Sequence, residues 1–285
     1  KKKCKCLRVL FLYILCRGRL FCHFSRFGGC VKTERAHKIL RNMYEMVISV
    51  AENRLGWLEK IDGGVRSAKN IAAAGACAVA KGTAYLCIGA DDRSSKVLRR
   101  LVRREISEIF LCDVKSGYIE KRLCGIKLGD CAKRLLVHAL TGFDREEEED
   151  MLRDRLTVGR RFDIDGFCRF RMREFYLRWD EMCSLARRHG DFLADEDTFR
   201  DLIRFLVDAG KRKGTRAEVY RLGGKFRLVE RNGGTETETT YDGLDDLVCR
   251  LIDFAPYETL LLGFKYDADY KKLSDIFDAK CDFLR

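Results

Sequence analysis

The segment 195–235 constrains the fold most strongly, because its capping and turn residues leave few alternatives. Asp195 stands where a helix N-cap is expected, apolar residues recur behind it at helical spacing, and Gly210 ends the pattern. Strand-like runs flank Gly223-Gly224, and Asn232-Gly233 marks a second tight turn before a Thr/Glu run. The segment therefore predicts a helix followed by a hairpin, or by a three-stranded meander if the Thr/Glu run is also a strand.

The rest of the C-terminal part continues with patterns of helical and strand length. Asp242 is placed to cap a helix, Pro256 follows the end of that helix, and the apolar run 258–264 has the length of a buried strand. A final helical stripe runs from Tyr270 to Cys281. We therefore expect C-terminal helices together with a β-hairpin or meander and a buried strand.

The region near residue 40 shows a different pattern. Apolar residues from Leu40 to Leu55 follow the three-four spacing of a helix with one buried side. The small-residue segment 70–82 is weakly patterned, so it is either a tightly packed helix or a flexible joint. Ala80 before Lys81 and Gly82 after it do not fit a phosphate-binding loop, which places Gly before the Lys and Ser or Thr after it.

Two apolar runs of strand length, 83–90 and 109–114, flank a helical stripe that ends at Ile106. This order predicts a β-α-β unit, whose strands are normally parallel. No G-x-G-x-x-G joins the first strand to its helix, so nothing in the sequence supports a dinucleotide site. The expected fold class is α/β (α+β). We expect a leader over 1–41, an N-terminal helix and β-α-β region over 42–150, and a C-terminal region over 151–285.

Residues 1–41 differ from the rest of the chain in charge. The chain carries a net charge of +12, and this segment accounts for +11 of it, because it holds twelve Lys or Arg and one acid, Glu34. The rest of the chain carries a net charge of only +1, so its positive and negative charges nearly cancel. The high pI therefore says little about the partners of the protein. The uncharged apolar run Val9–Cys16 is far shorter than the roughly 20 residues that span a bilayer. The segment is a peripheral membrane anchor, a packed basic segment, or translated sequence upstream of a start at Met43 or Met46, which we favour.

The fourteen cysteines predict neither a metal site nor a disulfide framework. No two stand in a C-x-x-C arrangement, which usually supplies half of a zinc site. Several lie in apolar stretches, where a free thiol packs as a small apolar side chain. We therefore expect reduced cysteines, no metal or cofactor, and a cytoplasmic protein without a transmembrane segment.

The stretch DGFCRFRMREFYLRW, residues 165–179, sets aromatic side chains among arginines. The aromatic residues recur at helical spacing, so we expect a helix, capped by Asp163 or Asp165, that buries its aromatic side, Phe170 included. The arginines then lie on the other sides of that helix. The base-stacking motif of RNA-binding strands has a basic residue where this stretch has Asp165.

This stretch is followed by FLADEDTFRDLIRFLVD, the hairpin and LVCRLIDFAPYETLLLG. In order and spacing these segments resemble the sporulation family named YtxC, over roughly residues 160–270. DAGKRKG departs from that family, which tends to carry a longer, proline-bearing connection there. The resemblance implies a protein of endospore-forming bacteria with no assigned enzymatic activity. The candidate partner-binding or motif residues are Asp165, Arg169, Phe170, Arg171 and Arg173. The resemblance singles out Arg171, whose pair with Phe170 belongs to the matching motif, and we expect it to bond a carboxylate such as Asp165 or Glu174, or to contact a partner.

No catalytic signature accompanies these segments. None of the four histidines stands in H-E-x-x-H, and no G-x-S-x-G occurs. We therefore predict a non-catalytic binding or structural factor with an unknown protein partner. One alternative is a metal-independent hydrolase or transferase that uses Asp163, Asp165 and arginines in a C-terminal pocket. The other is a nucleic-acid-binding protein.

Overall fold

The computed structural model describes residues 43–68, 71, 73–190, 193 and 195–282, so the expected leader over 1–41 lies outside the described residues. Two compact units make up the chain. The N-terminal unit runs up to Glu105 and takes in Val158–Phe167, and the C-terminal unit contains Ile106–Thr157 and the chain from Cys168 onward. Both helices and mixed sheets occur in the described residues, which confirms the α/β class.

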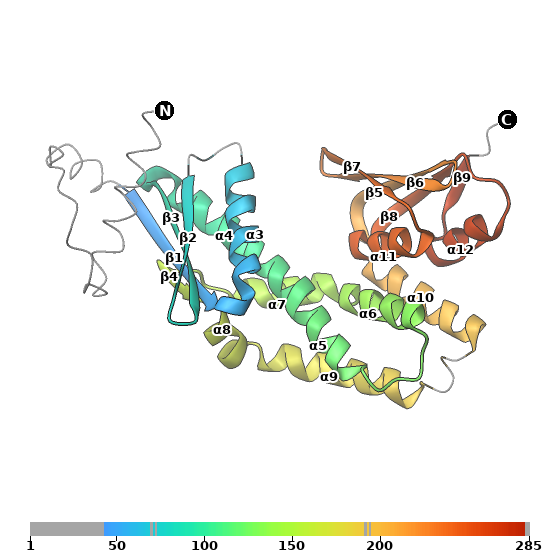
Figure 1. The fold of residues 1–285 in the computed structure, drawn as a ribbon, viewed down its shortest axis with the longest axis horizontal. Helices are drawn as coiled ribbons and strands as arrows, with labels where there is room; N and C mark the ends of the chain where they lie inside the picture. Colours follow the sequence, from blue (N-terminus) through green and yellow to red (C-terminus); the bar gives the residue numbers. More distant parts are fainter. Residues whose placement is uncertain (1–42, 69–70, 72, 191–192, 194, 283–285) are drawn as a thin grey trace, which may run out of the picture. The chain divides into compact units, whose positions relative to one another are not determined.

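The described part of the N-terminal unit contains a four-stranded sheet (Figure 1). Its strand order is β2-β3-β1-β4, with β1 (Met43–Ala51) and β2 (Ala73–Ala80) both antiparallel to β3 (Thr83–Asp91). The short β4 (Arg161–Asp163) returns from later in the chain and runs parallel to β1.

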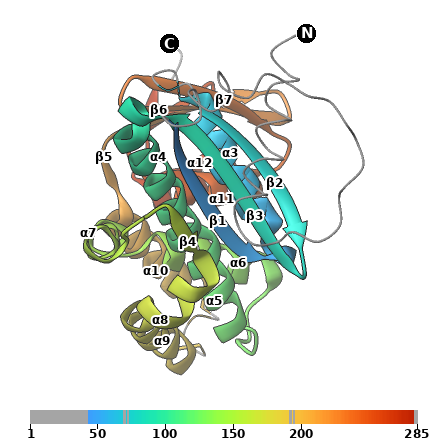
Figure 2. The same cartoon turned by 90° about the vertical axis from the view of Figure 1, so that its left-hand side faces the viewer.

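Helices α3 (Leu55–Ser67) and α4 (Ser95–Glu108) lie on the same side of this sheet (Figures 1 and 2). The strand residues that face them are fully buried and alternate along β1 and β3. They include Met46, Ile48 and Leu86. The core of this unit therefore lies between the helices and one face of the sheet.

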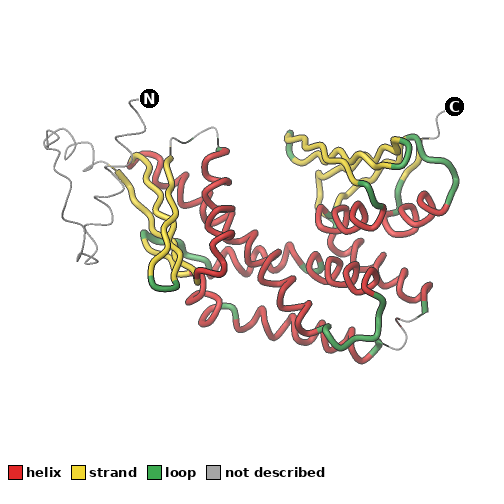
Figure 3. The backbone as a smooth tube through the Cα atoms, viewed as in Figure 1, coloured by secondary structure: helices red, strands yellow, loops and turns green. Residues whose placement is uncertain are grey.

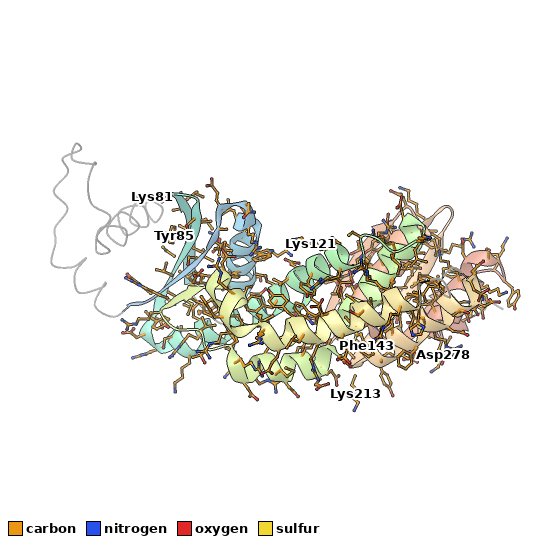
Figure 4. The ribbon with its side chains drawn as sticks, turned by 90° about the horizontal axis from the view of Figure 1, so that it is seen from below. Lys81, Tyr85, Lys121, Phe143, Lys213 and Asp278 are labelled. Atoms are coloured by element: carbon orange, nitrogen blue, oxygen red, sulfur yellow. The ribbon has the colours of Figure 1, made fainter. Side chains whose placement is uncertain are left out.

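Two expectations for this unit are wrong. The segment from Leu40 to Leu55, expected as a helix, forms strand β1 from Met43, because burial alternates along it and Val and Ile favour extended backbone. The segment 70–82, expected as a helix or a joint, contains strand β2. Lys81, labelled in Figure 4, occupies with Gly82 the two-residue turn between β2 and β3, and both have positive φ.

The prediction of a second strand for the β-α-β unit is also wrong. Ile109–Val114 forms a π-helical turn between α4 and α5 (Lys115–Arg122). Ile109, Phe110 and Leu111 are all buried. An apolar run this short does not distinguish a buried strand from a helical turn that is buried on several sides.

Helices make up most of the C-terminal unit as far as Gly210. Helix α10 follows its expected N-cap Asp195, whose carboxylate accepts a hydrogen bond from the Thr198 N–H at 2.9 Å. The helices of this part are α6 (Asp130–Gly142), α7 (Arg145–Arg155), α8 (Ile164–Arg171, which begins in the N-terminal unit), α9 (Arg173–Arg188) and α10 (Glu196–Gly210).

The predicted meander and buried strand form a second sheet of order β7-β6-β5-β8-β9. The antiparallel strands are β5 (Arg212–Leu222), β6 (Lys225–Asn232) and β7 (Thr235–Tyr241). Strand β8 runs parallel to both β5 and β9. Two helices, one between β7 and β8 and one between β8 and β9, lie on one side of the sheet (Figure 3). The elements in chain order are α11 (Leu244–Phe254), β8 (Pro256–Leu262), α12 (Ala268–Phe277) and β9 (Lys280–Asp282).

Two details of this part differ from expectation. Gly243, not Asp242, is the N-cap of α11, and Asp242 instead pairs with Lys225 across the end of the meander. Cys281 lies in β9 and not in the last helix. No described helix has the length and apolar character needed to cross a membrane.

Candidate functional site: an exposed arginine–phenylalanine face

Met172 separates α8 from α9 and changes which side chains are buried. Its backbone (φ −95°, ψ 7°) departs from α-helical values, and its side chain is fully buried. Phe167, Phe175 and Trp179 are buried as expected, but Phe170 is 75% exposed. The expectation of a buried Phe170 is therefore wrong, because Met172 takes the inward position at the junction.

The arginines beside Phe170 have no partners within the described chain. Arg169, Arg171 and Arg173 are exposed, and none makes a hydrogen bond or ion pair with another described residue. By contrast, Arg155 donates to Glu174, and Arg178 donates to Glu147. Three cationic groups at this junction are therefore left for solvent or a partner.

Two of these arginines lie close to Phe170 along the chain, on either side of the break at Met172. Arg169 and Phe170 stand near the end of α8, and Arg173 and Leu177, four residues apart, are neighbours on the surface of α9. Leu177 is 58% exposed. We call Arg169, Phe170, Arg173 and Leu177 the Arg–Phe face.

The fifth candidate, Asp165, has a different role. Its carboxylate accepts hydrogen bonds from the Ala51 N–H at 2.6 Å and from Arg54 Nη1 at 2.5 Å, at the end of β1. Arg171 bonds neither Asp165 nor Glu174, so the expected bond to one of these acids is wrong, and its contact with a partner stays a prediction. Asp165 therefore stabilises the N-terminal unit.

The acids proposed for hydrolytic chemistry both belong to the N-terminal unit. Asp163 Oδ1 lies 3.5 Å from Ser49 Oγ, across the parallel pair of β1 and β4. Its carboxylate also closely approaches the backbone of Gly166, where a Cβ atom would lie 2.6 Å from Asp163 Oδ2. These contacts give Asp163, like Asp165, a structural role in joining β1, β4 and the start of α8.

A buried ion pair supports α9 from inside the C-terminal unit. Lys115 Nζ donates to Glu148 Oε2 at 2.8 Å and to the Phe143 carbonyl oxygen at 2.7 Å. Trp179 Nε1 donates to Glu148 Oε1 at 2.7 Å. Burial lowers the pKa of Lys115 and raises the pKa of Glu148, because each charge is poorly solvated there. The network ties α5, α7 and α9 together.

A second polar cluster lies beside the π-helical turn. Arg145 uses all of its guanidinium nitrogens: Nη2 donates to Glu108 at 2.6 Å, Nε to Glu149 at 2.9 Å, and Nη1 to the Cys112 sulfur at 3.1 Å. These bonds fix the start of α7 against the turn. Neither cluster was predicted from the sequence, because Lys115 lies more than 30 residues from Glu148, Glu108 lies more than 30 residues from Arg145, and no local motif connects them.

His138 was also missed, since its sequence position indicates an ordinary helix surface. Its Nδ1 lies 2.7 Å from Asp253 Oδ1. The hydrogen bonds with Asp253 and with Cys249 raise the pKa of His138 to about 10. A histidine between a thiol and a carboxylate contains the groups of nucleophilic catalysis. Cys249, however, is only 6% exposed and packs in the main apolar cluster, so the arrangement joins α6 to α11.

The described residues contain no group of three or more His, Cys, Asp or Glu side chains that could hold a metal ion. Every cysteine in the described ranges is a free thiol. No protein-family model, curated protein or solved structure matches the chain. The likeness to the YtxC family therefore stays a prediction from the sequence.

Proposed function

We propose that this protein is a non-catalytic binding factor that contacts a protein partner through the Arg–Phe face. The observation that carries the proposal is the exposure of Phe170 beside arginines that no described carboxylate neutralises. Burying a phenylalanine side chain is worth about 1.5–3 kcal/mol, which the free protein forgoes at this position. Aromatic and arginine side chains are also the residues that dominate the binding energy of protein interfaces.

The scaffold under the face favours the same proposal. Trp179 and Phe175 anchor α9 inside the unit, and the bond from Trp179 to Glu148 fixes its rotation. Side chains on a fixed helix lose little conformational entropy when they bind. Arg173 and Leu177 on α9 are therefore preorganised, and the buried Cys168 and Met172 anchor the end of α8, which carries Arg169 and Phe170.

The biological setting in this proposal comes from the sequence. The resemblance over roughly residues 160–270 places the factor in sporulation of endospore-forming bacteria. The absence of disulfides among the described cysteines supports a cytoplasmic setting in this proposal, since thiols are kept reduced there.

Site-specific crosslinking tests the proposal. A photo-reactive phenylalanine analogue replaces Phe170 in sporulating cells, and the same analogue replaces Phe205, a 61% exposed phenylalanine on α10, as the control. We expect a discrete protein adduct from position 170 that the double change Arg169→Glu, Arg173→Glu removes, and none from position 205. An adduct that survives the charge reversal, or no adduct at 170, would refute the proposed function.

A further inference from the structure

The Arg–Phe face also specifies what kind of partner it fits. We infer that it binds an acidic protein segment in which carboxylates surround an apolar side chain. This inference rests on the proposed function and assigns the chemistry of the partner. It is carried by the charge of the face, by its two apolar side chains, and by a contrast with a similar pair on α10.

The charge of the face is positive and not compensated. Arg169, near the end of α8, and Arg173, at the start of α9, lie on either side of Phe170 and Met172 along the chain, and both residues are exposed without a described partner. A guanidinium group is a planar fork that matches a carboxylate with two parallel hydrogen bonds. Two such groups so close along the chain therefore favour a segment with two or more acidic side chains.

The apolar part of the face lies next to these arginines. Phe170 and Leu177 are 75% and 58% exposed and lie on either side of Arg173 along the chain. Interfaces place an apolar or aromatic anchor at the centre and charged groups at the rim. The partner segment therefore needs an apolar side chain between its acids.

The same residues fit single-stranded nucleic acid less well. Non-specific nucleic-acid binding combines a basic groove that follows the backbone with aromatic side chains on which successive bases stack. The chain beyond residue 41 carries a net charge of only +1, and the face offers a single exposed aromatic ring, Phe170. A short acidic peptide segment requires neither an extended basic field nor several rings.

Helix α10 carries a similar pair in a different electrostatic context. Arg204 and Phe205 are both exposed, and Arg204 makes no ion pair with a described residue, because Asp208 bonds Lys211 at 2.7 Å instead. Asp201 lies three residues before Arg204 on the same helix, so this pair has less local positive charge than the Arg–Phe face. The pair serves as a matched control for the Arg–Phe face.

The test measures binding of fluorescein-labelled probes to the full chain by fluorescence anisotropy. The acidic probe is a peptide of Glu-Phe-Glu repeats, and the comparison probes are Gln-Phe-Gln repeats, Glu-Ala-Glu repeats and oligo(dT). We expect the acidic probe to bind most tightly, and to lose about tenfold or more in affinity with Phe170→Ala and with Arg169→Glu, Arg173→Glu. The control changes Arg204→Glu and Phe205→Ala should leave its affinity unchanged.

A reversal of sign separates recognition from indirect structural effects. The Arg169→Glu, Arg173→Glu protein should bind a peptide of Lys-Phe-Lys repeats more tightly than the wild type does. Binding of oligo(dT) that depends on Phe170 would overturn the acidic-segment inference while the binding function stands. Binding of the acidic probe that is insensitive to Phe170, or no binding, would also overturn it, and the crosslinking at Phe170 then decides the proposed function separately.

Discussion

Glu148 Oε2 lies 2.8 Å from Lys115 Nζ, and neither side chain is more than 3% exposed. Water does not solvate either charge, so each depends on the other and on the bonds from Trp179 and to Phe143. Removing one partner therefore leaves a buried charge without compensation.

Lys115→Met should lower the free energy of unfolding of the C-terminal unit by about 3–5 kcal/mol, because Glu148 stays buried without its cation. The further change Glu148→Gln should recover part of this loss, since an amide needs no cation and its oxygen still accepts from Trp179. Urea unfolding measures both. In a Trp57→Phe background the fluorescence of Trp179 reports this unit alone. Losses that simply add in the double variant would contradict the pairing.

Phe170→Ala should change the stability by about 0.5 kcal/mol or less, because the side chain is exposed. Phe175→Ala, five positions later, should cost about 3–5 kcal/mol, because that ring is fully buried. The same urea experiment compares the two. A large loss from Phe170→Ala would show that this ring packs against the protein.

Stability should depend on the ionisation of His138. Its pKa is raised from 6.5 to about 10 by Asp253 first and then by Cys249, so the folded state holds the proton more tightly than the unfolded state. The stabilisation is complete below about pH 6.5 and is lost as the pH rises through about 10. His138→Gln should remove this dependence, and Asp253→Asn should remove most of it. Parallel stability curves for wild type and His138→Gln between these pH values would contradict the assignment.

Cysteine alkylation should distinguish Cys124 from Cys183. Cys124 is exposed, whereas Cys183 is buried and desolvation raises its pKa to about 11, which leaves little reactive thiolate at neutral pH. In the native protein, iodoacetamide should label Cys124 within minutes and label Cys183 only after unfolding. Peptide mass spectrometry measures both rates. Equal rates would show that the helices around Cys183 open readily.

The sequence predicted the elements whose signals are local. Gly223-Gly224 forms the turn between two paired strands, and Asp195 caps the helix that follows it. Both features depend only on neighbouring residues, so both could be predicted from the sequence. The segment from Leu40 to Leu55 was misread, because β1 buries every second residue and Tyr44 and Ile48 are also four apart. Its partner strand β3 lies about 40 residues later in the chain, so a local sequence pattern does not reveal the pairing.

The candidate site shows the same limit. The sequence identified the aromatic and arginine residues of 165–179 as a candidate site. The break at Met172 exposes Phe170, which was expected to be buried, and no Gly or Pro in the sequence indicates that break. The partners of Arg155 and Arg178, which leave Arg169 and Arg173 as the unpaired cations of the face, depend on tertiary packing. Which arginines of the face are unpaired, and that Phe170 is exposed, could therefore be determined only from the structure.

The π-helical turn Ile109–Val114 is a place where the chain can change length without a change in packing. A π-turn holds more residues than an α-turn, so deleting one residue here would allow an unbroken α-helix. Because the wider turn absorbs the extra residue, the deletion would leave the later side chains pointing much as they do now, and Lys115 would still face Glu148. Lineages that shorten this turn by one residue should therefore keep both the lysine and the glutamate.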